Sequence, residues 1–398
     1  MKMSKAMVMS VGTGVSDDEK AVASLTHALE HSINAAHPDK LFLVLTAESQ
    51  KKTLPRLEPK LTMPYEVILL DNPDDIEIIY TSLSPRFRDI RKEFSLLTVD
   101  YTSGTKAMTS ALVLLGTRFE VDNLTYVHGL RKGGIVLSGT EKVKIVTPNF
   151  VTAERRIEVA ISFFDKCQYD AALAVMEDIR SITADPRILE RVEPLENASK
   201  AYSLWDMFYH EKAVVEFKQV KPADFDANKR FLGSMLRSAE KEPSLIADLI
   251  NNAKRRGGVG FKFDDAVARL YRLMELIAQY RLKSHGIADT ANVDPNIIQD
   301  ELRKRWQFYG RAPLQLGLHK SYELLASKND KLGQAYEKDK RLRDLLTKRN
   351  NSILAHGLEP VGHAIYEELL EKVRSYAAMA VSNLDQLLQD SHFVKWPR

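Results

Sequence analysis

Two side chains with catalytic potential, Arg349 and His356, lie seven residues apart in the stretch KRNNSILAHG. A histidine titrates near neutral pH, so it can serve as a general acid or a general base. An arginine guanidinium can hold a phosphate through paired hydrogen bonds and stabilise charge that develops on it. These two residue types therefore suit the cleavage of a phosphodiester next to a hydroxyl group, a reaction that needs no metal ion.

The spacing of this pair predicts where the two side chains lie. Seven residues are almost two turns of an α-helix, so both side chains are expected on one helix face. Gly357 and Pro360 follow closely and place His356 in the last helical turn, where the helix dipole favours imidazolium. Asn350 can orient the phosphate or the histidine. The alternative is a surface arginine, a helix-end histidine and a plain exposed or packing amide that align by chance.

Two glycine-containing turns form a second candidate site. Gly12, Thr13 and Gly14 follow a first apolar run, and Thr102, Ser103, Gly104, Thr105 and Lys106 follow a later one. Small residues let backbone N–H groups approach a ligand, and a helix N-terminus with a lysine favours an anion. Neither turn has the glycine spacing of a dinucleotide fingerprint or of a P-loop. Tight strand–helix connections alone also produce such residues; together the turns favour a phosphate-bearing ligand other than NAD or ATP.

The elements that position these turns alternate along residues 5–146. AMVMSVGTG, LFLVLTAES, YEVILLDN, FSLLTVDYTSGT and LTYVHG predict strands, with helical patterns between them. This alternation predicts an α/β Rossmann-like domain with a parallel sheet, in which both turns face one crevice. GLRKGGIVLSGTEKVKIV adds a terminal hairpin. After Pro148 the patterns are helical, which predicts an all-α C-terminal half, with a long helix ending at His356 and a final helix at 363–389.

The composition is that of a globular protein of two or three domains, with 398 residues and a formal net charge of +3. Residues 251–356 carry 21 Lys and Arg against 12 Asp and Glu, a bias that suits RNA, although solvated helices can share it. The single Cys167 cannot form an internal disulfide or a cysteine-based metal site. No signal-peptide pattern and no run of 18 apolar residues is present, so a soluble cytoplasmic protein is expected.

The two turns resemble those of a CARF domain, the sensor of ancillary proteins in type III CRISPR systems. The segment Asp100-Tyr101-Thr102-Ser103-Gly104-Thr105-Lys106-Ala107-Met108 looks like the family pattern, with Ser103 at a frequent glycine. The resemblance implies that Gly12, Thr13, Gly14 and Thr102 to Lys106 cradle a cyclic oligoadenylate across a dimer axis. Glu48 and Ser49, together with His128 and Arg131, are further candidates for lining it, and structural roles for these four are equally open.

The Arg349–His356 pair resembles the R-x(4–6)-H motif of a HEPN ribonuclease, with Asn350 in the expected polar position. The resemblance implies that two chains place their motifs side by side in a composite site. Arg349, His356 and Asn350 would be catalytic, no metal or other cofactor would be needed, and the products would end in a 2′,3′-cyclic phosphate and a 5′-hydroxyl.

The combined interpretation is a CARF–HEPN ancillary ribonuclease. It has a CARF-like sensor at 1–148, a helical spacer at 149–254 and a HEPN domain at 255–398. The expected protein is a cytoplasmic homodimer without a membrane partner that cuts single-stranded RNA in antiviral defence. Its allosteric activator would be a cyclic oligoadenylate made by the type III effector complex, with tetra-adenylate favoured.

Two alternatives stay open at this point. One is a ligand-binding regulator whose α-helical half binds nucleic acid or a partner without cutting. The other adds cleavage of the cyclic activator in the CARF crevice, for which Thr13, Thr105 and Lys106 are the candidates.

Overall fold

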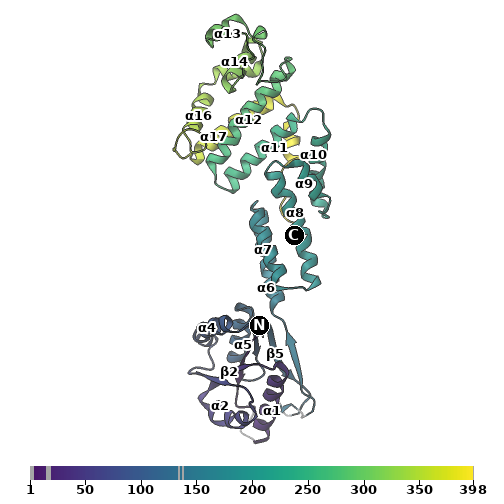
Figure 1. Ribbon diagram of the computed structural model, residues 1–398, viewed down its shortest axis with the longest axis vertical. Helices are drawn as coiled ribbons and strands as arrows, with labels where there is room; N and C mark the ends of the chain where they lie inside the picture. The colour runs from purple at the N-terminus through teal and green to yellow at the C-terminus, as the bar shows by residue number, and fades with distance from the viewer. Residues whose placement is uncertain (1–3, 15–18, 133–134, 137–138, 398) are drawn as a thin grey trace. The chain divides into compact units, whose positions relative to one another are not determined.

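The protein divides into two compact units in the computed structural model, which describes residues 4–14, 19–132, 135–136 and 139–397 (Figure 1). Unit 1 comprises Met1–Glu158 and Asp178–Leu189, and unit 2 comprises Val159–Glu177 and Glu190–Arg398. The helices α6 (Asn149–Asp165), α7 (Tyr169–Ile182) and α8 (Pro186–Asp206) contribute residues to both units.

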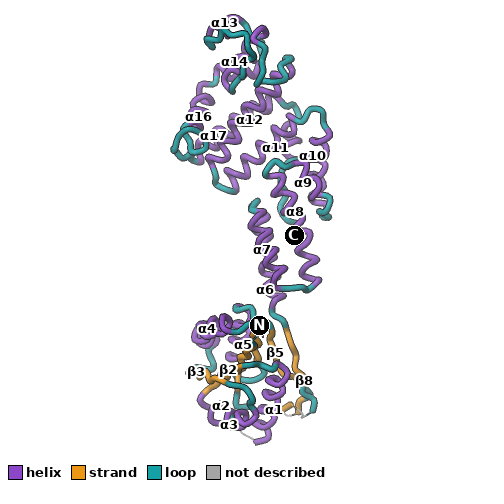
Figure 2. The backbone as a smooth tube through the Cα atoms, in the orientation of Figure 1, coloured by secondary structure: helices purple, strands orange, loops and turns teal. Residues whose placement is uncertain are grey.

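Unit 1 is an α/β domain, as the alternating patterns predicted. Figure 2 shows the strands gathered in this unit among the described residues. Its remaining elements are β1 (Lys5–Val11), α1 (Glu19–Ala36), β2 (Lys40–Thr46), α2 (Ala47–Lys52), α3 (Leu54–Leu57), η1 (Glu58–Lys60), β3 (Tyr65–Leu70), α4 (Ile76–Glu93), β4 (Leu96–Asp100), α5 (Lys106–Arg118), β5 (Asn123–His128), β6 (Arg131–Lys132), β7 (Ile135–Val136) and β8 (Lys142–Val146).

The central sheet has six strands in the order β3-β2-β1-β4-β5-β8. All neighbouring pairs are parallel except β5–β8, which is antiparallel. The predicted hairpin is confirmed as the antiparallel pair β6–β7, although its Gly133-Gly134 turn lies outside the described residues. The Rossmann-like prediction is therefore correct.

Hydrophobic cores on both faces of the sheet explain why the inner strands are almost continuously apolar. Ala6 and Val8 of β1 belong to a core formed with α4 and α5. The alternate residues Met7 and Met9 belong to a second core formed with α1 and α3. Side chains alternate across a strand, so burial on both faces demands apolar residues at every position.

The chain reverses its direction of strand addition between β1 and β4, which are neighbours in the sheet. Such a switch point opens a crevice beyond the carboxyl ends of the strands. Gly12–Gly14 follow β1 and Thr102–Thr105 follow β4, so the two predicted turns meet at this crevice.

Unit 2 is helical, which confirms the all-α prediction for the C-terminal half. Its core surrounds α12, which packs against α11, α14 and α17. None of the helices in the described parts of the chain is long and apolar enough to cross a membrane. The elements are α9 (His210–Phe217), η2 (Ala223–Phe225), α10 (Asp226–Arg237), α11 (Glu242–Lys254), a π-helical turn η3 (Arg255–Val259), α12 (Phe263–Ser284), η4 (Pro295–Ile297), α13 (Asp300–Arg305), α14 (Leu318–Ser327), α15 (Lys331–Lys338), α16 (Lys340–Asn350), α17 (His363–Ala380) and α18 (Leu384–Asp390).

Two helix predictions in unit 2 were wrong in their boundaries. The long helix expected to end at His356 breaks at Asp339, whose carboxylate caps α16, and ends at Asn350. The final helix expected at 363–389 is interrupted between α17 and α18. After Asn350 the chain folds back onto the helix end instead of continuing the helix: the Ser352 N–H donates to the Arg349 carbonyl at 3.0 Å and the His356 N–H to the Asn350 carbonyl at 3.0 Å.

Candidate functional site

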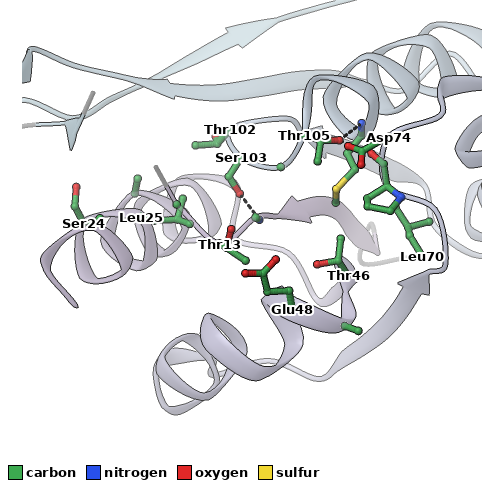
Figure 3. Close-up of a pocket in the computed structure, with 18 of the residues that line it drawn as sticks. Thr13, Ser24, Leu25, Thr46, Glu48, Leu70, Asp74, Thr102, Ser103 and Thr105 are labelled. Carbon is green, nitrogen blue, oxygen red and sulfur yellow. Dashed lines mark hydrogen bonds between the residues drawn. The ribbon is translucent and has the colours of Figure 1, made fainter. Parts of the chain in front are cut away.

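A cavity of about 710 Å³ lies at the crevice of unit 1 (Figure 3). Both glycine-containing turns line it, together with residues of α1, α2, α5, β2, β3, β5 and β7 and of the segment that follows β3. The lining side chains that Figure 3 labels are Thr13, Ser24, Leu25, Thr46, Glu48, Leu70, Asp74, Thr102, Ser103 and Thr105.

Ser103 ties the two turns together. Its Oγ accepts a hydrogen bond from the Gly12 N–H at 3.0 Å and donates one to the Ser10 carbonyl at 3.0 Å. The Ser10 hydroxyl in turn donates to the Ser103 carbonyl. The side chain that stands at a frequent glycine of the CARF pattern thus has a specific role here, and it satisfies the Gly12 N–H within the protein.

Gly12 and Gly104 are in close backbone contact. A Cβ atom built on Gly12 would lie 2.8 Å from the Gly104 nitrogen, too close for any side chain. Gly104 has a φ of +115°, which residues with a Cβ rarely adopt. These two glycines therefore let the turns after β1 and β4 meet.

The loop after β4 is further held by its own side chains. The Thr102 Oγ1 accepts from the Val127 N–H at 3.0 Å, and the Thr105 Oγ1 caps α5 through the Met108 N–H at 3.1 Å. Asp100 is buried and accepts from the Thr102 N–H, the Thr125 hydroxyl and the Ser32 hydroxyl. Burial raises the pKa of the Asp100 carboxyl, and the hydrogen bonds partly offset that rise.

The structure separates the predicted ligand-binding residues into two groups. Gly12, Thr13, Gly14, Glu48 and Thr102 to Thr105 line the cavity, whereas Lys106 and Ser49 are outside its lining. Lys106 is exposed at the start of α5. Ser49 is buried and closes a capping box with Thr46 at the start of α2. The Glu48 carboxylate pairs with Lys52 at 2.7 Å.

The two further candidates after β5 are placed differently. His128 is exposed and its ring lies 6.0 Å from that of Tyr126, outside the cavity lining. The side chain of Arg131 lies outside the described residues.

Sequence reasoning missed several residues of the cavity. Asp71, Pro73 and Asp74 follow β3 and line it. β3 is parallel to β2, so its carboxyl end lies at the same edge of the sheet. Residues that follow this predicted strand could therefore have been predicted to line the crevice. Ser24 and Leu25 come from the middle of α1, where no sequence pattern marks them.

The Arg349–His356 pair lies at the C-terminal end of α16 in unit 2. The prediction that both side chains lie on one helix face is wrong, because Arg349 is in the last helical turn and His356 is in the loop that follows. The loop folds back onto the helix end: the His356 N–H donates to the Asn350 carbonyl at 3.0 Å, and the Glu359 N–H to the Asn351 carbonyl at 3.1 Å. The folded loop, and not helical spacing, therefore places the backbone of His356 at the C-terminal end of α16.

Gly357 makes this return possible. A Cβ atom on Gly357 would lie 2.0 Å from the Asn351 carbonyl oxygen, inside the contact distance of any two atoms. The Gly357 N–H also donates to the Ser352 carbonyl at 3.3 Å. A glycine directly after the histidine is thus required by the packing of the loop.

The Arg349 guanidinium is held on the face of an aromatic ring. Its Cζ lies 4.2 Å from the centre of the Tyr271 ring on α12, and its Nη1 donates to Asn350 Oδ1 at 3.2 Å. Burial and Glu275 raise the pKa of the Tyr271 phenol, while Arg349 opposes that rise. Arg349 Nε and Ser352 Oγ are buried and have no hydrogen-bond partner among the described residues.

Chemically, this helix end presents an oriented cation, and the backbone of His356, whose side chain is exposed, is hydrogen-bonded to the same helix end. A guanidinium fixed by stacking can bind a phosphate with little loss of conformational freedom. The neighbouring α12 arginines are already engaged, since Arg269 pairs with Asp265 and Arg272 with Glu275.

Comparison with known proteins adds two family matches. Residues 236–380 match the Csm6 HEPN domain, and residues 152–246 match the Csm6 6H domain. Arg349, Asn350 and His356 lie within the first of these stretches. None of the proteins with curated functions matches the sequence.

A solved Csm6 structure shares the overall fold of this chain. Csm6 of Enterococcus italicus, bound to cyclic hexa-2′-fluoro-hexa-dAMP, is 12% identical and matches with a TM-score of 0.61 over 98% of each chain. Can2 of Sulfobacillus thermosulfidooxidans, in complex with cyclic tetra-adenylate, is 12% identical and has a TM-score of 0.25, covering 52% of this chain and 68% of its own.

The two Csm6 domain matches together cover residues 152–380, unit 1 has the fold and the paired turns expected of a sensor, and the Csm6 fold extends over nearly the whole length. This protein belongs to the CARF–HEPN ancillary ribonucleases of type III CRISPR systems.

Proposed function

We propose that the protein is a homodimeric endoribonuclease that cuts single-stranded RNA, without a metal ion, when a cyclic oligoadenylate occupies the unit 1 cavity. Residues 1–148 act as the sensor, 149–254 as the coupling segment and 255–398 as the nuclease. The protein acts in the cytoplasm in antiviral defence. The observation that carries this proposal is the loop of residues 351–359, which folds back so that His356 and Arg349 share one end of α16.

The proposed reaction uses the RNA's own 2′-hydroxyl as the nucleophile. A histidine accepts the 2′-hydroxyl proton while the 2′-oxygen attacks the adjacent phosphorus, and the bond from phosphorus to the 5′-oxygen breaks. A proton delivered to that oxygen gives a 5′-hydroxyl, and the other product ends in a 2′,3′-cyclic phosphate. Arg349 stabilises the charge on the phosphate, and Asn350 orients the guanidinium through their hydrogen bond.

Exposed apolar residues beside His356 support a second copy of the chain as the partner. Ile353 is 62% exposed, Leu354 48% and Leu358 85%. Clustered apolar side chains at one loop favour burial in an interface. The unpartnered Arg349 Nε and Ser352 Oγ nearby also fit a site that is completed by the second chain or by the substrate, because buried polar groups without partners cost free energy.

The cavity chemistry supports a ligand with both phosphates and amino groups. The N-terminus of α5 and the turn backbones favour phosphate oxygens. The carboxylates of Glu48, Asp71 and Asp74 are acceptors that suit the exocyclic amino group of adenine. We favour a ring of four adenylates and take six as the alternative, because the ligand of the E. italicus structure has six.

Activation requires that the ring bind better to the form in which two Arg349–His356 pairs are correctly placed. The test is cleavage of a labelled single-stranded RNA in EDTA, alone and with cyclic tri-, tetra- or hexa-adenylate, with the product ends identified by mass spectrometry. Cutting with one ring only, leaving cyclic phosphate ends, supports the proposal. Ring binding without cutting under any ring favours a regulator instead, and consumption of the ring by a His356→Ala variant would reveal cleavage of the activator.

A further inference from the structure

A second group of basic residues in unit 2 surrounds α13 and does not include Arg349 or His356. It consists of Arg303, Lys304, Arg305, Tyr309 and Arg311, and is called the α13 surface below. Lys304, Arg305, Tyr309 and Arg311 are exposed, and Tyr309 is 76% exposed, more than most large apolar or aromatic side chains of the protein. An aromatic ring in water among cations is the combination that stacks on bases and contacts phosphates of single-stranded nucleic acid.

The backbone conformation at the C-terminal end of α13 positions the α13 surface. The Gln307 N–H donates to the Lys304 carbonyl at 3.1 Å and the Phe308 N–H to the Arg303 carbonyl at 2.9 Å. Gln307 has a φ of 52°, so α13 ends in a Schellman motif that turns the chain sharply. The Arg303 guanidinium then donates to the Gly310 carbonyl at 3.4 Å, which keeps the segment with Tyr309 beside α13.

Trp306 and Tyr309 have different roles on the two sides of this turn. Trp306 packs against the unit 2 core, and its indole N–H donates to Glu323. It therefore anchors the segment. Tyr309, by contrast, presents its ring to solvent, so it is the aromatic residue available for stacking.

The cationic side chains of the α13 surface also differ in whether carboxylates already pair with them. Arg305 lies 3.6 Å from Glu323 and 3.8 Å from Glu337, so carboxylates already balance its charge. Lys304 and Arg311 are exposed to solvent. These two side chains are the phosphate-binding candidates.

Glu337, in the last turn of α15, links the α13 surface to the helix that carries the motif. Arg305 approaches Glu337, and the Glu337 carbonyl accepts a hydrogen bond of 3.1 Å from Arg343 of α16. Arg343 precedes Arg349 by six residues on that helix, about 9 Å along its axis. Figure 1 shows α13, α14 and α16 in the same part of unit 2.

We propose that the α13 surface is a second contact site for single-stranded RNA, which guides the strand along α16 toward Arg349 and His356. Tyr309 stacks on a base, while Lys304 and Arg311 bind phosphates. The inference rests on the proposed ribonuclease function. It predicts that long RNA gains affinity from this surface and that a substrate of a few nucleotides does not.

The test combines binding and cleavage in the full chain. Binding of a labelled RNA of about 20 nucleotides is measured with the His356→Ala protein, with and without Tyr309→Ala or the pair Lys304→Ala and Arg311→Ala. Loss of one stacked base weakens binding by about fivefold or more. Loss of two phosphate contacts lowers the slope of log affinity against log salt by about 1.4. Tyr309→Phe retains the affinity.

The matched control is Tyr209 of the same unit, which is 53% exposed and carries Lys212 at 5.0 Å from its ring. Tyr209→Ala with Lys212→Ala should change neither affinity nor salt slope. In otherwise wild-type protein, the α13 variants should lower kcat/KM for the long RNA and leave it unchanged for a tetranucleotide.

Three results overturn the inference: unchanged binding, equal loss in the control, or conversion of a dimer to a monomer, which would make the surface a subunit interface. Binding is measured separately from cutting. A wild-type protein that cuts no RNA would therefore contradict the proposed function, while the binding result still decides the role of the α13 surface.

Discussion

The Arg349 guanidinium stacks on the ring of Tyr271, with 4.2 Å between its Cζ and the ring centre. The two residues lie far apart in sequence, on α16 and α12. This contact and the returning loop of residues 351–359 define how the candidate active site is held within one chain.

The Tyr271 ring is expected to position Arg349 for the transition state. Tyr271→Leu removes a cation–π contact of about 0.5–2 kcal/mol and should lower kcat about two- to thirtyfold, with a small effect on KM. Tyr271→Phe keeps the ring and should retain kcat. Steady-state cleavage assays at saturating activator measure kcat and KM for both variants. Equal losses in the Leu and Phe variants would show that the ring face does not position Arg349.

Replacing Gly357 should displace His356 without altering the cavity of unit 1. The Cβ of Gly357→Ala would clash with the Asn351 carbonyl at 2.0 Å, so the loop must open and RNA cleavage should fall at least tenfold, by about 1.4 kcal/mol or more in the barrier. Binding of the cyclic ring should be unchanged.

Gly362→Ala is the matched control for this prediction, since a Cβ at Gly362 meets nothing within 4 Å. Full activity in Gly357→Ala, or equal loss in Gly362→Ala, would argue against the packing role of Gly357.

Ser103 should control the affinity for the activator. Ser103→Ala removes the links to Gly12 and Ser10, each worth about 1 kcal/mol, so the Kd for the ring should rise about five- to thirtyfold. The maximal cleavage rate at saturating ring should stay the same. Isothermal titration calorimetry measures the Kd, with Ser110→Ala on the exposed side of α5 as the control. A lower maximal cleavage rate with an unchanged Kd would contradict this prediction.

The buried Asp100 predicts a pH-dependent stability. Its pKa is raised in the folded protein, so the folded state binds the proton more tightly than the unfolded chain, whose aspartates titrate near about 3.9. Stability is therefore lost as the pH rises above that value through the raised pKa.

Asp100→Asn removes this titration. The difference in melting temperature between the variant and the wild type should move in favour of the variant as the pH rises above about 3.9, as measured by calorimetry on the full chain at a series of pH values. A difference that is independent of pH would mean that Asp100 does not titrate as its burial implies.

The sequence was informative where one local pattern determined one structure. The alternation of apolar strands, such as β1 and β2, with helical patterns predicted the parallel sheet, and glycines at strand ends predicted the crevice. Asp71 and Asp74 were missed because only the strand order brings the end of β3 to the cavity. The helix through His356 was predicted wrongly because Ile353 and Leu354 continue the apolar spacing beyond Asn350. Long-range contacts such as Tyr271 with Arg349, and the role of Ser103, required the structure.

The most direct test of the account separates sensing from cutting in one set of proteins. Binding of cyclic tetra- and hexa-adenylate and cleavage of single-stranded RNA are measured for the wild type, for His356→Ala and for Thr13→Trp, which fills the unit 1 cavity. The account predicts that His356→Ala binds the activating ring and does not cut, and that Thr13→Trp neither binds the ring nor cuts in its presence. RNA cleavage by His356→Ala at the wild-type rate would contradict the account. Full ring-dependent cleavage by a Thr13→Trp protein that cannot bind the ring would contradict it as well.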